Sequence, residues 1–547
     1  MRSWALYVTH CVSLEDVGTA TIVRVQISSA RSRGFFDTSC HELSRPSRSD
    51  GSNVLPGGKQ GAARFPALGW AWLACAFGTM AIDLAKLGRR SFVTQSALAE
   101  ILQFAEEHHE ELKDMGKSRP SIKRARVRAI GDETPFGPVL KEVLAKAEDG
   151  TSVGIWLTSP AAMLHRACSE CPHFAQFFEK IVDSASQTLT FAIYTDEVTP
   201  GNQLKAQNHR KVWSFYWAVQ EVGSKVLASE YAWFMGAIVR TNVVSTLAGG
   251  VSEVLKHVVH SFFQPGQDFR NGVILPLPSG PRVVCGRIKR VFGDESAIKH
   301  LWHNKGASGK VLCLFCRTTV QQRYAPAPLG GLVLHTEADP SKFLLHTDRT
   351  IYNVIDFLKV EKGLKGKGAF SELEKNLGFN FASEGALNDE LVRAEVGPAS
   401  TTCFDPMHIY LVAGLLHEEI TLLLDALKKA KIKQSAVDAF FQEHTWPSLN
   451  GKNSGARTSF SKKVDLDDGW KSPAGDCLGV YPVLRSFLAS LPREAFTPGL
   501  ALAVKSYYAL AMVLDAVKPA LTGTTSAETL MEKIKQHVIA FQAGVVI

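Results

Sequence analysis

Apolar runs bounded by turn residues predict strands in the middle of the chain. Thr188–Asp196 (TLTFAIYTD), Val212–Val219 (VWSFYWAV) and Trp233–Val244 (WFMGAIVRTNVV) are rich in β-branched and aromatic residues, which favour strands. Gly286–Asp294 (GRIKRVFGD) predicts a fourth strand that ends in an acid, and Val311–Cys316 (VLCLFC) predicts a fifth.

Apolar residues at helical spacing lie between and around these strands. Gly249–Phe263 predicts a helix after the third strand, and Glu295–Trp302 predicts a short helix after the fourth. The resulting order, β-β-β-α-β-α-β, predicts an α/β fold with a mixed sheet flanked by helices. Helical spacing also dominates residues 135–185 and 401–547, so we expect helical amino-terminal and carboxyl-terminal regions.

Changes in composition along the chain of 547 residues suggest five segments. They are 1–65, rich in Ser, Arg and Gly and expected to be disordered; 66–187, mostly helical; 188–320, the α/β core; 321–400, an irregular insertion with Gly- and Lys-rich patches; and 401–547, helical. A chain of this length exceeds one ordinary core, so two to four domains are expected.

The overall composition is that of a globular protein in water. Apolar residues make up 45% and charged residues 21%, which are ordinary values for that class. Pro66–Ile82 is apolar without a charge but shorter than the roughly 20 residues of a spanning helix. A membrane anchor, a buried helix and a poorly matched amino-terminal extension all stay open for it. We do not expect a membrane partner.

Positive charge is in modest excess and is concentrated in one short run. The formal net charge is +8, from 61 Lys and Arg against 53 Asp and Glu, which permits contact with nucleic acid but does not predict it alone. The run KSRPSIKRARVR is either a solvated loop or a DNA-backbone contact or nuclear-import signal. Its cationic residues are Lys117, Arg119, Lys123, Arg124, Arg126 and Arg128.

Two of the predicted strands end in an aspartate. Asp196 ends the first strand and Asp294 the fourth, so the carboxylates meet at one edge if those strands are neighbours. Paired carboxylates suit Mg²⁺ or Mn²⁺. Two such ions about 4 Å apart can activate a water and stabilise the leaving oxygen of a phosphodiester. The alternative is that both acids only open turns, where Asp is common.

Close cysteine pairs are candidate metal ligands, because we expect the ten cysteines to be reduced in a chain without a visible secretory signal. Cys168 and Cys171 lie in a helical pattern and are expected to pack. For Cys313 and Cys316, zinc binding and packing both stay open. Zinc needs two further ligands, for which the histidines at hand are His335, His346, His408 and His417.

Three motifs in a fixed order resemble cut-and-paste DDE transposases. Gly293–Cys316, GDESAIKHLWHNKGASGKVLCLFC, is similar to the segment around the second catalytic Asp. Ile193–Asn202, IYTDEVTPGN, is similar to the first catalytic strand. Phe404–Leu411, FDPMHIYL, resembles the D-x2-H motif of the CACTA-like group and its relatives.

This resemblance implies an RNase H-like fold, two divalent metal ions, and hydrolysis plus strand transfer at transposon ends in the nucleus. Asp196 and Asp294 would be the catalytic metal ligands. Cys313 and Cys316 would hold a structural zinc, together with His408. Asp405 and His408 match the D-x2-H motif.

The family also has a third acid, a Glu on a helix well after the D-x2-H motif, and we find no matching residue downstream. Glu418, Glu419 and Glu443 stand too close to the motif. We therefore expect a carboxyl-truncated, transposase-derived protein that acts on DNA, whose ancestral cleavage and strand transfer need not survive. The alternative is a non-catalytic DNA-binding or interaction protein on an RNase H-like scaffold. The oligomeric state, a homo-oligomer included, stays open.

Overall fold

A computed structural model provides the fold of the chain. The residues described are 133–185, 188–199, 211–320, 327–337, 339–412, 414–445, 464–465, 469–470, 474–521 and 525–545. The segment 1–65, the apolar stretch Pro66–Ile82 and the basic run Lys117–Arg128 lie outside these residues.

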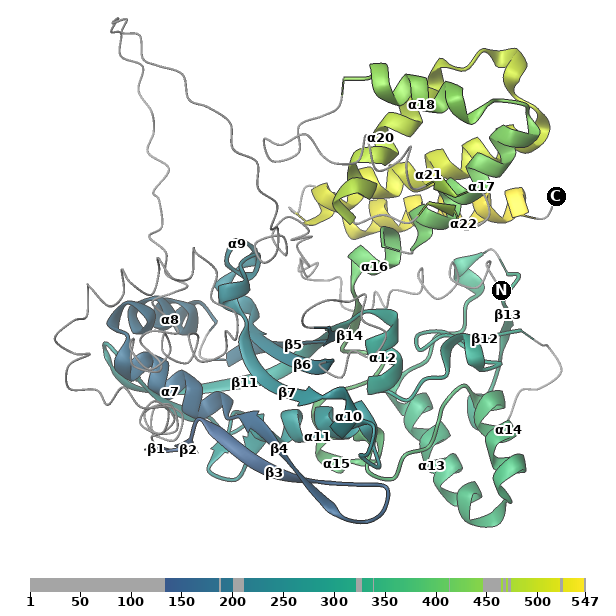
Figure 1. Cartoon of the computed structure of the whole chain (residues 1–547). Helices are drawn as coiled ribbons and strands as arrows, with labels where there is room; N and C mark the ends of the chain where they lie inside the picture. The colour runs from purple at the N-terminus through teal and green to yellow at the C-terminus, as the bar shows by residue number, and fades with distance from the viewer. Residues whose placement is uncertain are drawn as a thin grey trace, which may run out of the picture.

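The centre of the molecule is a mixed sheet flanked by helices, as the order of elements predicts (Figure 1). Five of its strands lie side by side in the order β7-β6-β5-β11-β14. Their bounds are β5 (Thr188–Val198), β6 (Val212–Val219), β7 (Phe234–Arg240), β11 (Gly280–Gly293) and β14 (Thr402–Phe404). β5, β6 and β7 form an antiparallel meander, whereas β11 runs parallel to both β5 and β14.

Three further strands widen the sheet, and two of them correct the prediction that residues 66–187 are mostly helical. β3 (Leu140–Lys146) and β4 (Ser152–Thr158) form a hairpin beside β7. Buried and exposed residues alternate along β4, so its period is that of a strand with one buried face. The helices α7 (Pro160–Glu170) and α8 (Pro172–Ser184) agree with the prediction, and β10 (Val273–Leu277) pairs with the start of β11.

Aromatic side chains fill the space between the sheet and α11 (Gly250–Phe262). The Phe191 ring lies 5.8 Å from that of Trp217 and 4.9 Å from that of Phe262, and all three residues are fully buried. A Cβ at Gly286 on β11 would lie 2.3 Å from the Phe191 ring. Glycine at that position therefore allows the ring to lie against the sheet, where each aromatic pair contributes about 0.5–1.5 kcal/mol beyond its buried area.

The segment after α12 (Glu295–Leu301) differs from the sequence prediction. Val311–Cys316 is not a strand but an irregular stretch tied to its neighbours by single bridges. The following insertion, predicted to be irregular, contains helices α13 (Asp348–Leu364), α14 (Lys367–Leu377) and α15 (Glu390–Glu395). The Gly- and Lys-rich patch is the junction between α13 and α14, because Gly breaks helices without excluding them on either side.

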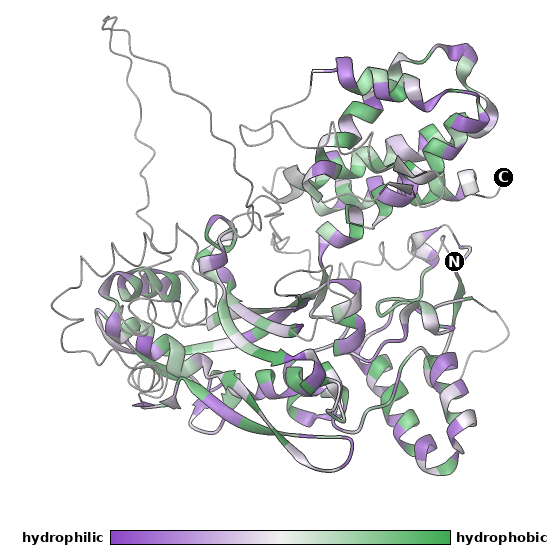
Figure 2. Cartoon of the chain, in the orientation of Figure 1, coloured by the Kyte–Doolittle hydropathy of each residue, from purple (hydrophilic) through white to green (hydrophobic). Residues whose placement is uncertain are grey.

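The carboxyl-terminal region is helical, as predicted, and has a hydrophobic core of its own. Its helices are α16 (Pro406–Tyr410), α17 (Leu415–Lys429), α18 (Gln434–Glu443), α20 (Ala474–Ser490), α21 (Pro498–Leu521) and α22 (Ala527–Val545). Figure 2 shows polar and apolar residues interleaved along their ribbons, as in helices that bury one side.

Two segments in this helical region, Pro406–Lys429 and Pro498–Val517, are long and apolar enough to cross a membrane by length and composition alone. They are 65% and 50% buried inside the fold. Core helices of water-soluble proteins pass the same test, so these segments are weak evidence for a membrane.

Candidate metal-dependent active site

Three aspartates lie at one level on three neighbouring parallel strands. Asp196 lies near the carboxyl end of β5, Asp294 directly follows β11, and Asp405 directly follows β14. Phe292 pairs with Tyr194, and Gly293 pairs with Phe404, so continuing each register aligns Asp294 with both other acids. β5 and β11 are neighbours, which is the condition under which the sequence reasoning places Asp196 and Asp294 at one edge.

The charges of the neighbouring acids act on Asp196. The pKa of Asp196 is raised from 3.8 to about 6, first by burial and next by the negative charge of Asp294. Asp405 adds to this rise in the pKa, while His408 opposes it. Burial and like charges both disfavour the ionised form, so this edge holds more negative charge than its own residues neutralise.

Asp294 and Asp405 also begin helices. Asp294 Oδ1 accepts a hydrogen bond of 2.6 Å from the Ala297 amide at the start of α12. Asp405 Oδ1 accepts one of 2.9 Å from the Met407 amide at the start of α16. An N-cap carboxylate satisfies an amide that the helix leaves unpaired and faces the positive end of its dipole. Both acids therefore have a structural role beside any chemical one.

His408, predicted from the resemblance as a zinc ligand beside the cysteines, is hydrogen-bonded at the carboxylate edge. Its Nδ1 lies 2.6 Å from Asp405 Oδ2, and this hydrogen bond raises the pKa of His408 despite partial burial. The charges of Asp294 and Asp196 raise that pKa further. The D-x2-H spacing produces the pair because residues i and i+3 share one face of the first helical turn.

Tyr194 is a site residue that the sequence reasoning missed. Its hydroxyl is hydrogen-bonded to Asp196, and its pKa is raised by burial and then by the charges of Asp196, Asp405 and Asp294. The two-residue period of a strand could have identified Tyr194, because residues i and i+2, here Tyr194 and Asp196, point to the same face of the sheet.

Glu197 points away from the other acids, in agreement with the choice of Asp196. The Lys211 ammonium donates to it at 2.9 Å and the Thr241 hydroxyl at 2.8 Å. Its charge is thus neutralised on the opposite face of β5.

The third acid of this edge is Asp405, not one of the glutamates weighed from the sequence. Glu419 lies in the core of the helical region, where its Oε1 accepts from Ser506 Oγ at 2.6 Å and lies 2.7 Å from His537 Nε2. The sequence analysis named Asp405 only as part of the D-x2-H motif, and the pairing of the three-residue strand β14 with β11 brings it beside Asp294.

The ligand atoms at this edge are of the type that a hard divalent cation binds. Carboxylate oxygens are what Mg²⁺ and Mn²⁺ prefer. Among the described residues, no three His, Cys, Asp or Glu side chains already stand in an arrangement that could hold a metal ion. Binding of a cation would therefore require the Asp294 and Asp405 carboxylates to turn partly away from the helix amides that they cap.

The two C-x2-C pairs lie in different surroundings. Cys168 and Cys171 pack in the main core at α7, and burial raises the pKa of the Cys168 thiol to about 12, as expected of packing residues. Cys313 and Cys316 form a small separate cluster with Phe315, against which Phe343 and Phe404 pack.

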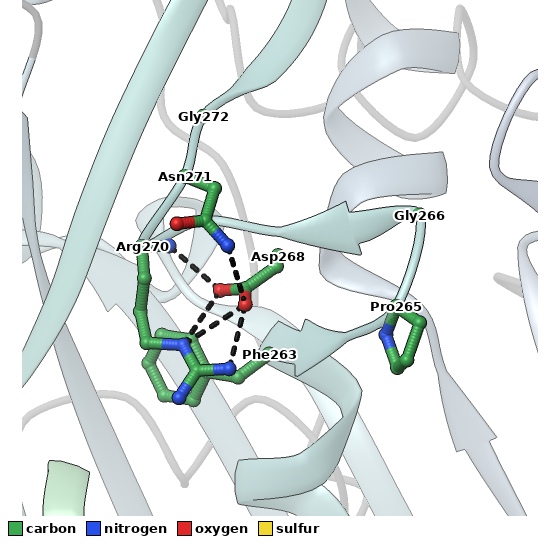
Figure 3. A pocket seen from close by; sticks show the side chains of 7 residues that line it. All are labelled: Phe263, Pro265, Gly266, Asp268, Arg270, Asn271 and Gly272. Atoms are coloured by element: carbon green, nitrogen blue, oxygen red, sulfur yellow. Dashed lines mark hydrogen bonds and ion pairs between the residues drawn. The ribbon is translucent and has the colours of Figure 1, made fainter.

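A pocket of about 460 Å³ lies at the hairpin of β8 (Phe263–Gln264) and β9 (Gln267–Asp268), shown in Figure 3. Its charged groups satisfy each other, since Arg270 Nη2 donates to Asp268 Oδ2 at 2.6 Å. Gly286, which bonds to this hairpin, is separated from Asp294 by roughly 25 Å of extended strand. This pocket is therefore not part of the carboxylate edge.

The residues predicted to contact nucleic acid, Lys117 to Arg128, lie outside the described part of the chain. No protein-family model and no curated protein matches this chain.

Proposed function

We propose that this chain is a transposase-derived protein whose carboxylate edge binds Mg²⁺ or Mn²⁺ and cleaves DNA phosphodiesters. The observation that carries the proposal is the alignment of Asp196, Asp294 and Asp405 on adjacent parallel strands. Their convergence at the carboxyl ends of these strands is where open α/β sheets bind ligands.

The strand order supports an RNase H-like core as the resemblance implies it. An antiparallel meander, β5-β6-β7, is followed by a helix and by β11, which returns parallel to β5 on its other side. After α12 and the insertion, β14 adds parallel to β11. The first acid thus lies on the central strand and the second on its parallel neighbour.

In this proposal, Asp196, Asp294 and Asp405 hold the cation. When bound, the cation lowers the pKa of an attacking water and stabilises the leaving oxygen. The Tyr194 hydroxyl, bonded to Asp196, orients that carboxylate. The His408 imidazole is hydrogen-bonded to Asp405 and therefore lies beside the acids. There it would contact a phosphate of the DNA.

Asp405 would take the place of the glutamate that the resemblance puts on a later helix. It is 3% exposed and its amide donates to Gly293 O at 2.9 Å, so the backbone fixes it beside Asp294. The pairing of β14 with β11 therefore sets the position of this third ligand.

A second candidate function has the same fold but no catalytic activity. The N-cap bonds of Asp294 and Asp405 favour it, because these acids would remain useful to the fold in a protein that cleaves nothing. On this alternative the chain is a DNA-binding or interaction protein, and binding depends on the basic residues rather than on the acids.

The deciding experiment measures nicking of a labelled DNA duplex by the full-length protein in Mn²⁺ and in Mg²⁺. We expect Asp196→Asn, Asp294→Asn and Asp405→Asn each to lower the rate by about 100-fold or more, the scale of losing one group that stabilises developing charge. The matched control is Glu197→Gln, which changes the adjacent carboxylate on the opposite face and should leave the rate within a few-fold of wild type.

Cleavage that persists in Asp196→Asn and Asp294→Asn would exclude this edge as the active site. Absence of cleavage by the wild type, together with duplex binding that weakens steeply with salt, would select the non-catalytic alternative.

A further inference from the structure

The face of the sheet that presents Asp196 continues across three more strands. Asp196 pairs with Ser214 on β6, and Ser214 pairs with Ile238 on β7. Continuing the register of β4 with β7 by one residue places Trp156 opposite Ile238. Residues directly opposite each other in an antiparallel sheet point to the same face. These four residues therefore form one row across β5, β6, β7 and β4, which Figure 1 shows side by side.

The outer end of this row is apolar and exposed. Ile238 is 47% exposed and Trp156 50%, and Leu144, which points to the same face of β3, is 69% exposed. On the opposite face, Phe215 and Ala237 are buried in the main core. Single exposed apolar residues are ordinary, but neighbours gathered on one face mark a binding surface.

The row is long enough for a short stretch of DNA. Neighbouring strands lie about 4.8 Å apart, so the three steps from Asp196 to Trp156 span roughly 14 Å. A stacked DNA strand advances about 3.4 Å per nucleotide, so roughly four nucleotides would reach from the acids to the indole.

One cation flanks the row. Arg240 lies two residues beyond Ile238 on β7 and opposite Val212, so it points to the same face, and it is exposed. At the outer end, Glu142 stands opposite Trp156. A chain of phosphates would therefore be repelled at the outer end and attracted on the Arg240 side.

These groups match the chemistry of an unpaired nucleotide. An indole stacks on the flat face of any base, and a neighbouring guanidinium binds the phosphate backbone. In a duplex each base is covered by its neighbours, so an unpaired base is the one that offers its face to a side chain. The face therefore favours single-stranded over fully paired DNA.

We propose that an unpaired DNA strand lies across this face, from the carboxylate edge to Trp156, with one base stacked on the indole and one phosphate bound by Arg240. This placement rests on the proposed action on DNA and names the substrate of that site, a duplex with a single-stranded stretch beside the bond to be cleaved. Ile238, between the indole and the acids, would contact the adjoining nucleotide.

The test measures binding of a labelled single-stranded oligonucleotide to the full-length protein by fluorescence anisotropy, in EDTA so that nothing is cleaved. We expect the wild type to bind this strand, and a duplex with an unpaired end, more tightly than a blunt duplex. Trp156→Ala should weaken binding of the single strand by about tenfold, within the range of one lost stacking contact. Trp156→Phe should stay within a few-fold of the wild type, because it keeps an aromatic ring.

Two variants test the neighbours of Trp156. Arg240→Gln should weaken binding and reduce the slope of log K against log salt by about 0.7, the value for one phosphate of a single strand. Ile238→Ala should weaken binding by a few-fold. Ile274→Ala is the matched control, since Ile274 is 56% exposed on β10 at the other edge of the sheet, and it should leave binding unchanged.

Strand binding and cleavage can fail separately. A wild type that cleaves no DNA but binds single strands through Trp156 would remove the proposed cleavage and support the binding face. Cleavage that depends on Asp196, together with single-strand binding that is unchanged in Trp156→Ala, would overturn the binding face alone. Asp196→Asn should bind the strand at least as tightly as the wild type, since it removes a negative charge from the row.

Thermal denaturation distinguishes DNA from protein as the occupant of this face. Because Trp156 is half exposed, Trp156→Ala should melt at the temperature of the wild type. A variant that melts at a lower temperature and binds single strands like the wild type would show that protein covers the face, which would overturn the proposal. A wild type that binds no single strand would overturn it as well.

Discussion

Two regions of the molecule bury carboxylates, and they do so in opposite ways. In the helical region, Glu419 on α17 is 1% exposed and is met by Ser506 from α21 and His537 from α22. At the sheet edge, Asp196 lies beside Asp294 and Asp405, with His408 as the cationic partner that lowers its pKa. One region surrounds an acid with donors, whereas the other gathers acids together.

The difference separates an acid that is bonded into the fold from the acids of the candidate site. A buried acid with satisfied oxygens contributes to the specificity of packing, and removing it leaves its partners unpaired. At the sheet edge, burial and the charges of Asp294 and Asp405 raise the pKa of Asp196, so its ionised form destabilises the fold at neutral pH unless a cation neutralises it. Functional sites concentrate such perturbed groups, so the sheet edge is the candidate site and the Glu419 cluster is not.

The largest effect on stability should come from Glu419. We expect Glu419→Ala to lower the free energy of unfolding of the helical region by about 3 kcal/mol, because it removes the buried acceptor of the Ser506 hydroxyl and the carboxylate beside the His537 imidazole. Chemical denaturation followed by circular dichroism measures it. Glu418→Ala, one residue earlier and partly exposed, should cost less than about 0.5 kcal/mol. Equal effects in both variants would remove the contrast.

Asp196 should show the opposite behaviour, with stability gained on neutralisation. Its pKa in the folded protein, about 6, exceeds its usual 3.8, so the folded state binds the proton more tightly than the unfolded state. The stability due to protonated Asp196 is full below about pH 4 and is lost as pH rises through 6. Asp196→Asn should therefore match wild type near pH 4 and exceed it at pH 8 by up to about 3 kcal/mol.

Denaturation curves across this pH range test the sign, and Glu197 is the matched control. Burial opposes the shift, but the hydrogen bonds from Lys211 and Thr241 lower the pKa of Glu197. Its contribution is therefore present above the unfolded pKa and lost in acid, so Glu197→Gln should weaken the protein at pH 8. A stabilising Glu197→Gln or a destabilising Asp196→Asn at pH 8 would contradict the charge balance proposed for the two faces of β5.

The smallest effect should come from cation binding to the folded wild type. Mg²⁺ at ten times its Kd should stabilise the protein by about 1.4 kcal/mol, since a ligand that binds only the folded state shifts unfolding by mass action. Thermal denaturation at pH 8 with and without Mg²⁺ measures it. Asp294→Asn and Asp405→Asn should remove the gain, and Glu418→Ala should keep it. The same gain in all variants would mean that Mg²⁺ acts elsewhere.

Periodicity in the sequence was enough to predict the central strands and helices. β5, β6, β7, α11, β11 and α12 are long or strongly patterned, and their local preference agrees with their place in the fold. β3 and β4 were missed although buried and exposed residues alternate along β4, because the helical spacing of the adjoining α7 and α8 was extended over the whole of residues 135–185. Of the insertion helices, α14 buries only Leu377, so it has no apolar stripe to read. α13 buries Ile351, Val354, Ile355 and Leu358 at helical spacing, a pattern that the sequence analysis passed over.

The sequence by itself determined the α/β order, the two acids at strand ends and the D-x2-H spacing, because each depends on neighbours within a few residues. Only the tertiary structure decided that Asp405 joins Asp196 and Asp294, that His408 sits with the acids, and that His346 faces the cysteine segment. All three facts depend on pairing between segments far apart in the chain: β14 with β11, and Leu345 with Cys316. Such pairing follows from the packing of the whole fold, which local spacing does not encode.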